Sequence, residues 1–576
     1  MTRIFEDPEQ FVDDALTGFV LANARTVRRV DGGVVRARAL RNGQVAVVVG
    51  GGSGHYPAFA GLVGEGMAAG AVCGNIFSSP SSGQAMRVAR AADAGGGVLF
   101  SYGNYAGDVI HFGEAERRLR DEGVDVRTVL VTDDVASAPL DDVERRRGIA
   151  GDLCVFRIAG AAAERGDSLD EVERLARHAN DRTRSHGVAF AGCTIPGADR
   201  ALFTVPEGMM SIGLGIHGEP GVRDVPMQSA KDLAATLLAP LLEQERPLGW
   251  GPRVSVIVNG LGTVKYEELF VLFRYVAEIL ESADLQIVEP ECGELVTSLD
   301  MAGVSVTLLW LDDELEPLWG APAAAPGYRK GSVAPAVEAA PASAPVTKAD
   351  TPVEQPREAA SPPSIAAAVH ARLLLARVRD LIADHAAELG DLDAIAGDGD
   401  HGVGMLRGLD AALAAAVAEP DDAGVDDVLV AAGDAWSEKA GGTSGALWGA
   451  AIGEFGRSVT RNGAMDAGAI ADAVSAASRR LQDLGGASLG DKTMVDAIVP
   501  FDETLSSLIS RDEPLDAALS GASAAASEAA AQTASLTPRK GRARPLAERS
   551  IGHPDPGAVS FALIVTAIAE YATPEQ

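Results

Sequence analysis

The spacing of apolar residues over the first 320 positions predicts alternating strands and helices. Short runs rich in Val, Leu and Ile end in glycine or aspartate: QVAVVVG (44–50), GVLFSYG (97–103), RTVLVTDD (127–134) and RVSVIVNG (253–260). Alanine-rich helical stretches separate them. This alternation is typical of sheets covered by helices on both faces. Because this half is longer than 300 residues, we expect two α/β subdomains within residues 1–320.

Residues 364–576 show helical spacing almost throughout. Ser364 is a plausible N-cap for a helix that runs to Gly390, and DAGAIADAVSAASRRLQDL (466–484) repeats the pattern. An all-α bundle or barrel is therefore expected. Between the halves, residues 321–363 are dominated by Ala, Pro, Glu, Ser and Thr. Such a segment buries too little surface to fold, so we predict a flexible linker; a long surface loop fits this length poorly.

Charge and cysteine content limit the partners and the compartment. The net charge of −32 predicts repulsion from nucleic acid and from anionic membranes, although metal ions or a basic cluster would still allow phosphate binding. No apolar run reaches the roughly 18 residues of a membrane span, and the N-terminus does not resemble a signal peptide. The four cysteines form no CxxC motif. We therefore expect a cytoplasmic protein without disulfides or a zinc site.

The loop DAIAGDGDHGVGM (393–405) gathers Asp393, Asp398 and Asp400. Three carboxylates this close repel one another unless a cation neutralises them, and oxygen ligands suit Mg²⁺, which substrate phosphates usually complete. His401 could donate to a phosphate or orient an aspartate. An Asx-turn is the alternative; a calcium site is less suitable because the EF-hand spacing is absent.

Two further stretches of the helical half fit phosphate binding. KAGGTSGALWGA (439–450) is a glycine-rich turn that opens a helix, where backbone N–H groups can hold phosphate. SLTPRKGRARPLAERSIGHPDPGA (535–558) gathers basic residues in an acidic chain, and a solvated charged loop is its alternative interpretation. The basic residues are Arg539, Lys540, Arg542, Arg544 and Arg549. No GxxxxGK[ST] motif occurs, which excludes a P-loop enzyme.

In the α/β half, glycine-rich loops follow the predicted strands, the usual position of a ligand site. GGGSGHYPAFAG (50–61) carries His55, and YGNYAGDVIHFG (102–113) carries Asp108, either a base or a cap. GLGIHGEPG (213–221) contains GxGxxG, but Pro220 stands where the helix of a dinucleotide site should run. His217 in this turn is either structural or a nucleophile that could add to a ketone carbonyl.

These motifs together resemble the dihydroxyacetone kinase family in its single-chain, ATP-dependent form. In the first half the resemblance rests on GGGSGH, FSSPS, GNYAGD, GIHGEPG and TSLDMAGVSVTLLWLDDE (297–314). In the second half it rests on GDGDHG, GGTSGA, GDKTMVDA (490–497) and KGRARPLAERSIGHPDPGA. They occur in the same order over nearly the whole chain.

The resemblance implies a role for each matching residue. His217 would hold a ketose as a covalent hemiaminal, Asp108 would take the proton of its terminal hydroxyl, and His55 would position that hydroxyl. Gly52, Ser79 and Tyr56 would line the substrate site. Asp393, Asp398 and Asp400 would bind two Mg²⁺ ions that bridge the phosphates of ATP. The nucleotide would be surrounded by His401, Thr443, Ser444, Gly445, Gly486, Met494, Arg542 and Asp555.

The family also implies a homodimer, in which each ATP domain could serve the partner's ketose site. Tyr56 and Asn75 replace the acidic residues common at these positions, which favours erythrulose as substrate over dihydroxyacetone. Dihydroxyacetone or glyceraldehyde, with a flavin-nucleotide cyclase side activity, is the second possibility. A ketose sensor without catalysis would not need the aspartate loop. A subunit fed by a phosphoenolpyruvate-dependent carrier would have its two halves in separate chains and hold its nucleotide permanently, so the fusion by a linker favours free ATP.

Overall fold

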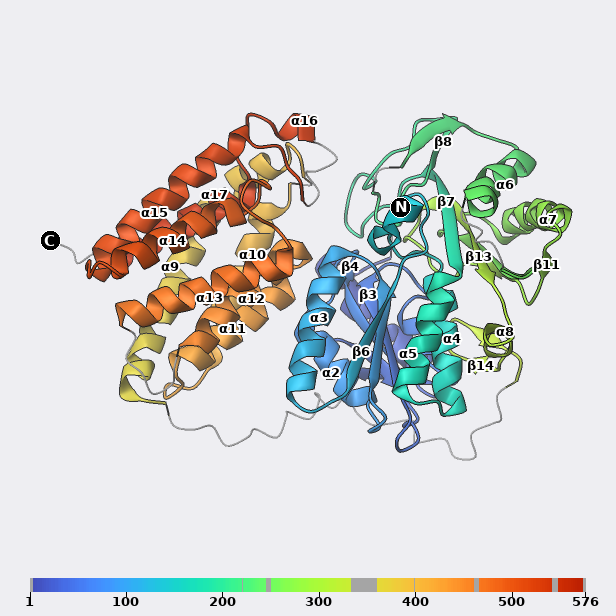
Figure 1. Ribbon diagram of the computed structural model, residues 1–576, viewed down its shortest axis with the longest axis horizontal. Helices are drawn as coiled ribbons and strands as arrows, with labels where there is room; N and C mark the ends of the chain where they lie inside the picture. The colour runs from blue at the N-terminus through green and yellow to red at the C-terminus, as the bar shows by residue number, and fades with distance from the viewer. Residues whose placement is uncertain are drawn as a thin grey trace. The chain divides into compact units, whose positions relative to one another are not determined.

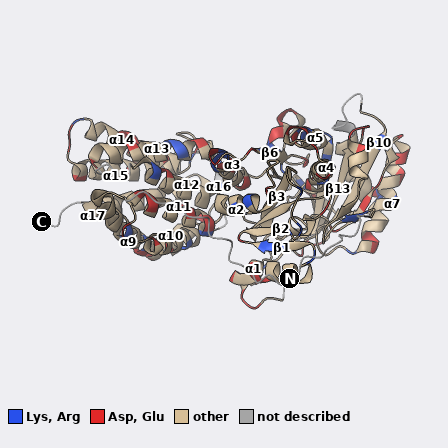
Figure 2. Cartoon of the chain, turned by 90° about the horizontal axis from the view of Figure 1, so that it is seen from below, with Lys and Arg blue, Asp and Glu red and all other residues tan. Residues whose placement is uncertain are grey.

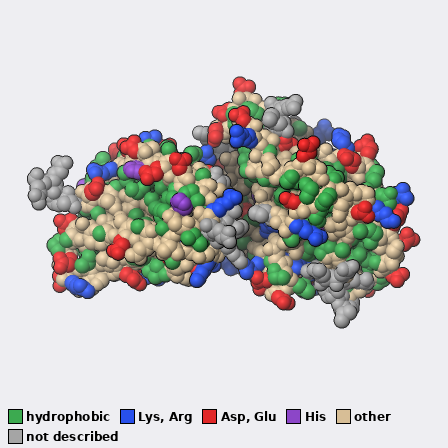
Figure 3. Space-filling view, turned by 90° about the horizontal axis from the view of Figure 1, so that it is seen from above, with side chains coloured by type: hydrophobic (Ala, Val, Ile, Leu, Met, Phe, Trp, Pro, Cys, Tyr) green, Lys and Arg blue, Asp and Glu red, His purple; other side chains and the backbone are tan. Residues whose placement is uncertain are grey.

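The computed structural model describes residues 4–219, 221–244, 250–332, 360–397, 399–459, 466–540 and 547–572. The chain divides into two compact units, Met1–Pro352 and Val353–Gln576 (Figure 1). Charged side chains of both signs are interspersed over each unit, as Figures 2 and 3 show. No helix within the described ranges is long and apolar enough to cross a bilayer.

A six-stranded sheet forms the first part of the N-terminal unit, in the order β1-β2-β4-β3-β5-β6. Neighbours from β4 to β6 pair in parallel, and β1 and β2 add an antiparallel edge. Three predicted strands are confirmed here, as β3, β5 and β6. The strands are β1 (Val27–Val30), β2 (Gly33–Arg36), β3 (Ala46–Ser53), β4 (Gly70–Ile76), β5 (Val98–Gly103) and β6 (Val126–Val131).

Helices cover both faces of this sheet, as expected: α2 (Ser82–Ala92) and α3 (Ala106–Asp121) on one, α4 (Asp152–Arg165) and α5 (Leu169–Asp181) on the other (Figure 1). Successive side chains of a strand point to opposite faces. Val47 and Val49 accordingly pack in the core with α4 and α5, whereas Ala46 and Val48 pack with α2 and α3. Since the parallel strands end at one edge, the loops after β3 and β5 lie close together.

A second sheet, in the order β11-β10-β13-β7-β8-β9, completes this unit, and β12 pairs with β10. It is antiparallel from β10 to β9, and its apolar residues pack against α6 (Ala230–Ala239) and α7 (Tyr266–Ser282). The expectation of two α/β parts is confirmed, with β10 as the fourth predicted strand. The strands are β7 (Thr183–Ala191), β8 (Met209–Ile212), β9 (Arg223–Pro226), β10 (Arg253–Gly260), β11 (Gln286–Ile287), β12 (Glu291–Gly293) and β13 (Ala302–Trp310).

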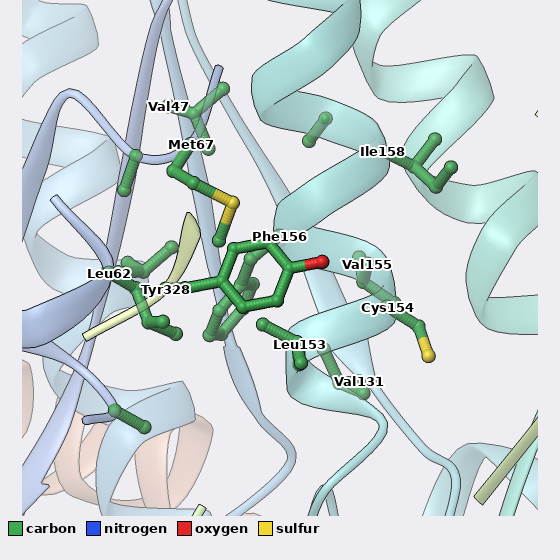
Figure 4. Packing of buried hydrophobic residues seen from close by; sticks show 14 of the residues in the cluster. Val47, Leu62, Met67, Val131, Leu153, Cys154, Val155, Phe156, Ile158 and Tyr328 are labelled. Atoms are coloured by element: carbon green, nitrogen blue, oxygen red, sulfur yellow. The ribbon is translucent and has the colours of Figure 1, made fainter. Parts of the chain in front are cut away.

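The first residues of the predicted linker belong to the folded unit instead. Strands β14 (Ala323–Ala324) and β15 (Arg329–Lys330) pair with each other, and Ala324 bridges to Glu65. The ring of Tyr328 lies among Leu62, Met67 and Phe156 in the core (Figure 4). Backbone pairing and one aromatic anchor thus order a segment whose composition alone predicts no fold. Residues 333–359 of the predicted linker lie outside the described ranges.

The C-terminal unit is a closed ring of helices around one apolar core. Each helix packs against the next, and α17 returns to α9, so the predicted all-α bundle or barrel is confirmed. Short connections make neighbours antiparallel, so every second connection lies at the same end of the ring. The helices are α9 (Pro362–Asp393), α10 (His401–Ala418), α11 (Val425–Ala440), α12 (Gly442–Ser458), α13 (Ala467–Gly485), α14 (Val495–Ile509), α15 (Leu515–Gln532), the short α16 (Ala547–Ser550) and α17 (Pro556–Ala572).

The N-cap of α9 is Ser361, one turn before the predicted Ser364. Ser361 accepts a hydrogen bond from the backbone N–H of Ser364. The hydroxyl oxygen of Ser364 instead accepts from the N–H of Val425 at 3.0 Å, which ties α9 to the start of α11. The prolines at 362 and 363 explain the earlier start, because proline suits the first turn of a helix.

Candidate active site

Two histidines that lie far apart in the sequence face each other in the N-terminal unit. His55 follows β3, and His217 lies between β8 and β9; their Nε2 atoms are 2.9 Å apart. The Nδ1 of His55 lies 2.7 Å from the carbonyl oxygen of Thr297. The Nδ1 of His217 lies 3.2 Å from a carboxylate oxygen of Glu219. Both outer partners are acceptors, so both Nδ1 atoms carry protons.

This arrangement requires a proton between the two Nε2 atoms. Two neutral imidazoles protonated at Nδ1 would point lone pairs at each other, which a 2.9 Å contact does not allow. Burial, and next the charge of His217, lower the pKa of His55 to about 3. His55 is therefore a weak base that gives up a shared proton readily.

Glu219 is fixed by contacts on both of its oxygens. Besides the Nδ1 contact, the backbone N–H of His217 donates to Oε2 at 3.0 Å, and a guanidinium nitrogen of Arg147 lies 3.7 Å from Oε2. Burial favours the neutral acid, but the charges of His217 and Arg147 and these hydrogen bonds outweigh it. They hold the pKa of Glu219 well below its usual range.

Asp108 lies in the first turn of α3, after β5. The hydroxyl of Ser79 donates to its Oδ2 at 2.8 Å. Burial raises the pKa of Asp108 to about 6, against the effect of the Ser79 hydrogen bond and of the charge on His217. Its second oxygen, Oδ1, is buried and has no hydrogen-bond partner among the described residues. This carboxyl group is therefore able to accept a proton from a bound hydroxyl near neutral pH.

Two predicted residues of the substrate site have different surroundings: Gly52 lies in close backbone packing, whereas Tyr56 is half exposed. A Cβ on Gly52 would lie 2.7 Å from the backbone nitrogen of Ser78, so only glycine lets the end of β3 approach this loop. The side chain of Tyr56 is 53% exposed and packs edge-on against Phe19 of α1 (Phe11–Ala22), with ring centroids 6.0 Å apart. Contact of Tyr56 with the substrate stays a prediction.

In the C-terminal unit, the aspartate loop joins α9 to α10. Asp393 ends α9, and its Oδ2 accepts from the N–H of Gly399 at 2.9 Å. Burial and the charge of Asp393 raise the pKa of Asp400, the residue before α10. Two carboxylates this close are what a bound cation would neutralise, so these residues fit Mg²⁺. Asp398 lies outside the described residues, and no group of three metal-ligating side chains occurs within them.

His401 begins α10, and its Nε2 lies 2.9 Å from the hydroxyl of Ser560 on α17. Thr443 and Ser444 are exposed at the start of α12. Gly445 is buried, and a Cβ there would lie 2.9 Å from that of Ala440. The two hydroxyls are therefore free to meet a ligand, whereas Gly445 serves the packing of the helix.

Three further predicted nucleotide residues lie at this end of the ring. Gly486 ends α13 in the left-handed conformation, with φ of +54°. Met494 precedes α14, and its Cβ lies 3.5 Å from where a Cβ on Gly557 would be. Asp555 caps α17 by accepting from the N–H of Ala558 at 2.8 Å. Burial, and Asp496 nearby, raise the pKa of Asp555 to about 7. Arg542 lies outside the described residues.

Sequence reasoning missed three residues near these sites: Glu219, Arg147 and Lys492. Glu219 could have been found, since it follows His217 by two residues in a quoted motif. Arg147 stands in an unremarkable basic run and reaches the site only through the fold. Lys492 is buried, and its ammonium group donates to the carbonyl oxygens of Leu536 and Ser550 at 3.2 and 2.7 Å.

Models of known protein families match both halves of the chain. The Dak1 domain matches residues 17–327, and the DAK2 domain matches residues 395–570. The chain belongs to the dihydroxyacetone kinase family. It has the single-chain form of this family, with the α/β Dak1 domain and the helical DAK2 domain in one polypeptide.

Three members of the family illustrate the similarity. L-erythrulose kinase of Pectobacterium atrosepticum is 51% identical over 574 residues, covering 99% of this chain and 96% of its own length. D-erythrulose kinase of Mycolicibacterium smegmatis is also 51% identical over 574 residues, covering 100% and 99%. The structure of the dihydroxyacetone kinase from C. freundii with AMP-PNP and Mg²⁺ aligns with a TM-score of 0.53 at 28% identity, covering 99% of each chain.

Proposed function

We propose that the protein is an ATP-dependent kinase that phosphorylates a terminal hydroxyl of erythrulose. The observation that carries this proposal is the His55–His217 contact beside the buried carboxyl of Asp108, in a chain half identical to erythrulose kinases over its whole length. A histidine nucleophile needs a carbonyl to attack, so the substrate is a ketose and not a polyol such as glycerol.

The histidine pair supplies both groups needed to bind a ketose covalently. Nε2 of His217 bonds to the carbonyl carbon, and the shared proton passes through His55 to the carbonyl oxygen, which becomes the hydroxyl of the hemiaminal. The positive charge stays on the alkylated imidazole of His217, where Glu219 compensates it. Fixing the ketose in one orientation aligns its terminal hydroxyl and lowers the entropy cost of the transfer.

Asp108 then acts as the base for phosphoryl transfer. Its unpartnered Oδ1 accepts the proton of the terminal hydroxyl while Ser79 holds the other oxygen. Ser79 and Gly52 form the wall of the substrate site, and Tyr56 tunes the choice of ketose. Phosphoryl transfer depends mainly on such positioning and on neutralising charge.

The C-terminal unit provides the ATP site. Asp393, Asp398 and Asp400 would hold Mg²⁺, which neutralises the charge of the phosphates of ATP. Thr443 and Ser444 offer hydroxyls to the nucleotide, and further contacts come from the other residues that the family resemblance assigns to it. These are His401, Gly445, Gly486, Met494, Arg542 and Asp555. The solved relative with AMP-PNP and Mg²⁺ supports this assignment for the family.

We also propose that the protein is a cytoplasmic homodimer that binds neither nucleic acid nor membrane. The net charge of −32 disfavours both of these partners. A dimer would let the ATP unit of one chain reach the ketose site of the other. We also propose three parts of the chain: a ketose unit that includes β14 and β15, a linker, and an ATP unit that begins with α9 at Pro362.

The test is an assay of ADP release with Mg²⁺ and ATP. L- and D-erythrulose are compared with dihydroxyacetone, glyceraldehyde and glycerol, since relatives named for either erythrulose are equally similar. We expect erythrulose to give the highest kcat/KM and glycerol to give no turnover. His217→Ala should abolish ketose turnover, and the control His385→Ala, on α9, should not. Turnover of dihydroxyacetone above both erythruloses would overturn the choice of substrate, and ketose binding without ADP release would leave a sensor.

A further inference from the structure

We propose that Arg147, clamped by Asp134, positions Glu219 and thereby selects the form of His217 that attacks the ketose. This inference rests on the proposed function and adds two positioning residues to it. Neither touches the histidine rings in any described contact, and both act through Glu219.

The guanidinium of Arg147 is held between two loops of different sheets. Its Nε and Nη2 donate to one oxygen of Asp134, at 3.0 and 2.7 Å. Asp134 follows β6 of the first sheet, is 2% exposed, and accepts on its other oxygen from the N–H of Ala136 at 3.1 Å. On the other side, Nη2 donates to the carbonyl oxygen of Gly213, after β8 of the second sheet, at 3.3 Å. Arg147 thus ties the loop that carries His217 to the first sheet.

The space above Gly215 is filled by the ion pair of Arg147 and Glu219. A Cβ at this position would lie 2.1 Å from Oε2 of Glu219 and 2.5 Å from Nη1 of Arg147. The φ angle of Gly215 is not in the left-handed region, so glycine is required here for space and not for backbone conformation. The side chains of Glu219 and Arg147 therefore pack directly against the backbone at Gly215, which fixes their position.

The position of Glu219 decides which nitrogen of His217 is nucleophilic. A carboxylate at Nδ1 keeps the proton there and leaves Nε2 to face the ketose. The titratable and charged groups that face Glu219 are His217, His55, Tyr105 and Arg147. Among these four, Arg147 alone is a cation over the whole working range of pH. Without it, burial raises the pKa of Glu219, and the carboxylate form is lost at a higher pH.

The experiment measures covalent adduct formation in the full chain without ATP. Erythrulose labelled with ¹³C at the carbonyl loses its ketone resonance and gains that of a tetrahedral carbon when the hemiaminal forms. We expect Arg147→Met to lower the adduct equilibrium constant by roughly 10- to 100-fold, by analogy with the loss that follows mutation of groups that orient metal-bound histidines. The acid limb of adduct formation should move to higher pH. Arg147→Lys should restore most of the adduct, since it keeps the charge.

Gly215→Ala tests the same pair without removing either charge. It should displace Glu219 from Arg147 and weaken the adduct, whereas Gly251→Ala, where a Cβ meets nothing within 4 Å, should match the wild type. Folding of each variant is checked by circular dichroism. Wild-type adduct levels and an unmoved acid limb in folded Arg147→Met or Gly215→Ala would overturn the inference alone. Absence of any adduct in the wild type would instead overturn the covalent step of the proposed function.

Discussion

Burial raises the pKa of Asp108, the proposed base, and the pH dependence of turnover should show this. Its pKa is raised to about 6, and only the ionised carboxyl can accept a proton. We therefore expect kcat at saturating ketose and ATP to fall as pH decreases through about 6, approaching tenfold per pH unit below it. Asp108→Asn should lower kcat by roughly 10²- to 10⁴-fold at pH 8, the usual contribution of a general base.

The Ser79→Ala variant tests whether Asp108 is the group whose titration produces the acid limb of kcat. The hydrogen bond from Ser79 lowers the pKa of Asp108, so its removal should move the acid limb of kcat to higher pH. Ser78→Ala is the matched control, since the hydroxyl of Ser78 donates to the backbone oxygen of Ile76 instead, at 3.2 Å. An acid limb at the same pH in the wild type and in Ser79→Ala would assign the titration to another group.

At the residue scale, the sequence predicts the chemical groups but not the contacts that tune them. His55, His217 and Asp108 stand in glycine-rich loops after apolar runs, a signal that can be read from one sequence. Arg147 has no such signal, and Asp134 ends the apolar run 127–134 but lies in no glycine-rich loop. Only the fold brings the loop after β6 next to the β8–β9 loop. The effect of Arg147 and Asp134 on Glu219 depends on distances of a few ångströms, and residue type does not encode these.

At the element scale, Lys492 joins two connections at one end of the helical ring, the one between α13 and α14 and the one between α15 and α17. It precedes α14 with φ of +60°, and its ammonium group donates to Leu536 after α15 and to Ser550 in α16. Lys492→Met should remove the hydrogen bond that the Leu536 carbonyl accepts and one of the two that the Ser550 carbonyl accepts, and so lower the free energy of unfolding of this unit by about 1–3 kcal/mol. Calorimetry should detect the change, and the KM for ATP should rise.

The matched control for this prediction is Lys439→Met, an exposed lysine in the last turn of α11. It should leave the unfolding transition unchanged. Adduct formation with the ketose should be normal in both variants, since the histidine pair lies in the other unit. Equal stability of Lys492→Met and the wild type would contradict a role of Lys492 in holding the connections together.

Most strands and helices can be predicted directly from the sequence, whereas the residues at which they begin and end are harder to predict. Runs such as residues 253–260, with Val or Ile at positions 254, 256, 257 and 258, predict buried strands, and alanine-rich spacing predicts the helices. Amino-acid composition does not predict the structure of a segment that only a few specific contacts hold in place. Residues 321–332 contain small and polar residues that read as linker, yet the pairing of β14 with β15 and the burial of Tyr328 hold them in the core.

At the scale of the whole molecule, the main question is which chain's ATP unit serves which ketose site. His217→Ala destroys one site and Asp398→Ala the other, so each homodimer should be inactive. A heterodimer of the two, isolated through different tags, should regain roughly half of the wild-type activity if the ATP unit of one chain acts on its partner, because one complete site then forms. It should stay inactive if each chain acts on itself.

A second heterodimer reverses this logic and serves as the control. It combines a wild-type chain with a chain that carries both substitutions. Action within one chain would give about half of the wild-type activity, since the wild-type chain is complete. Action between chains would give none, because each intact unit then faces a destroyed one. If one heterodimer is active and the other is not, the result determines whether an ATP unit acts on its own chain or on the partner chain. If neither is active and sedimentation shows only monomers, the proposed dimer is contradicted.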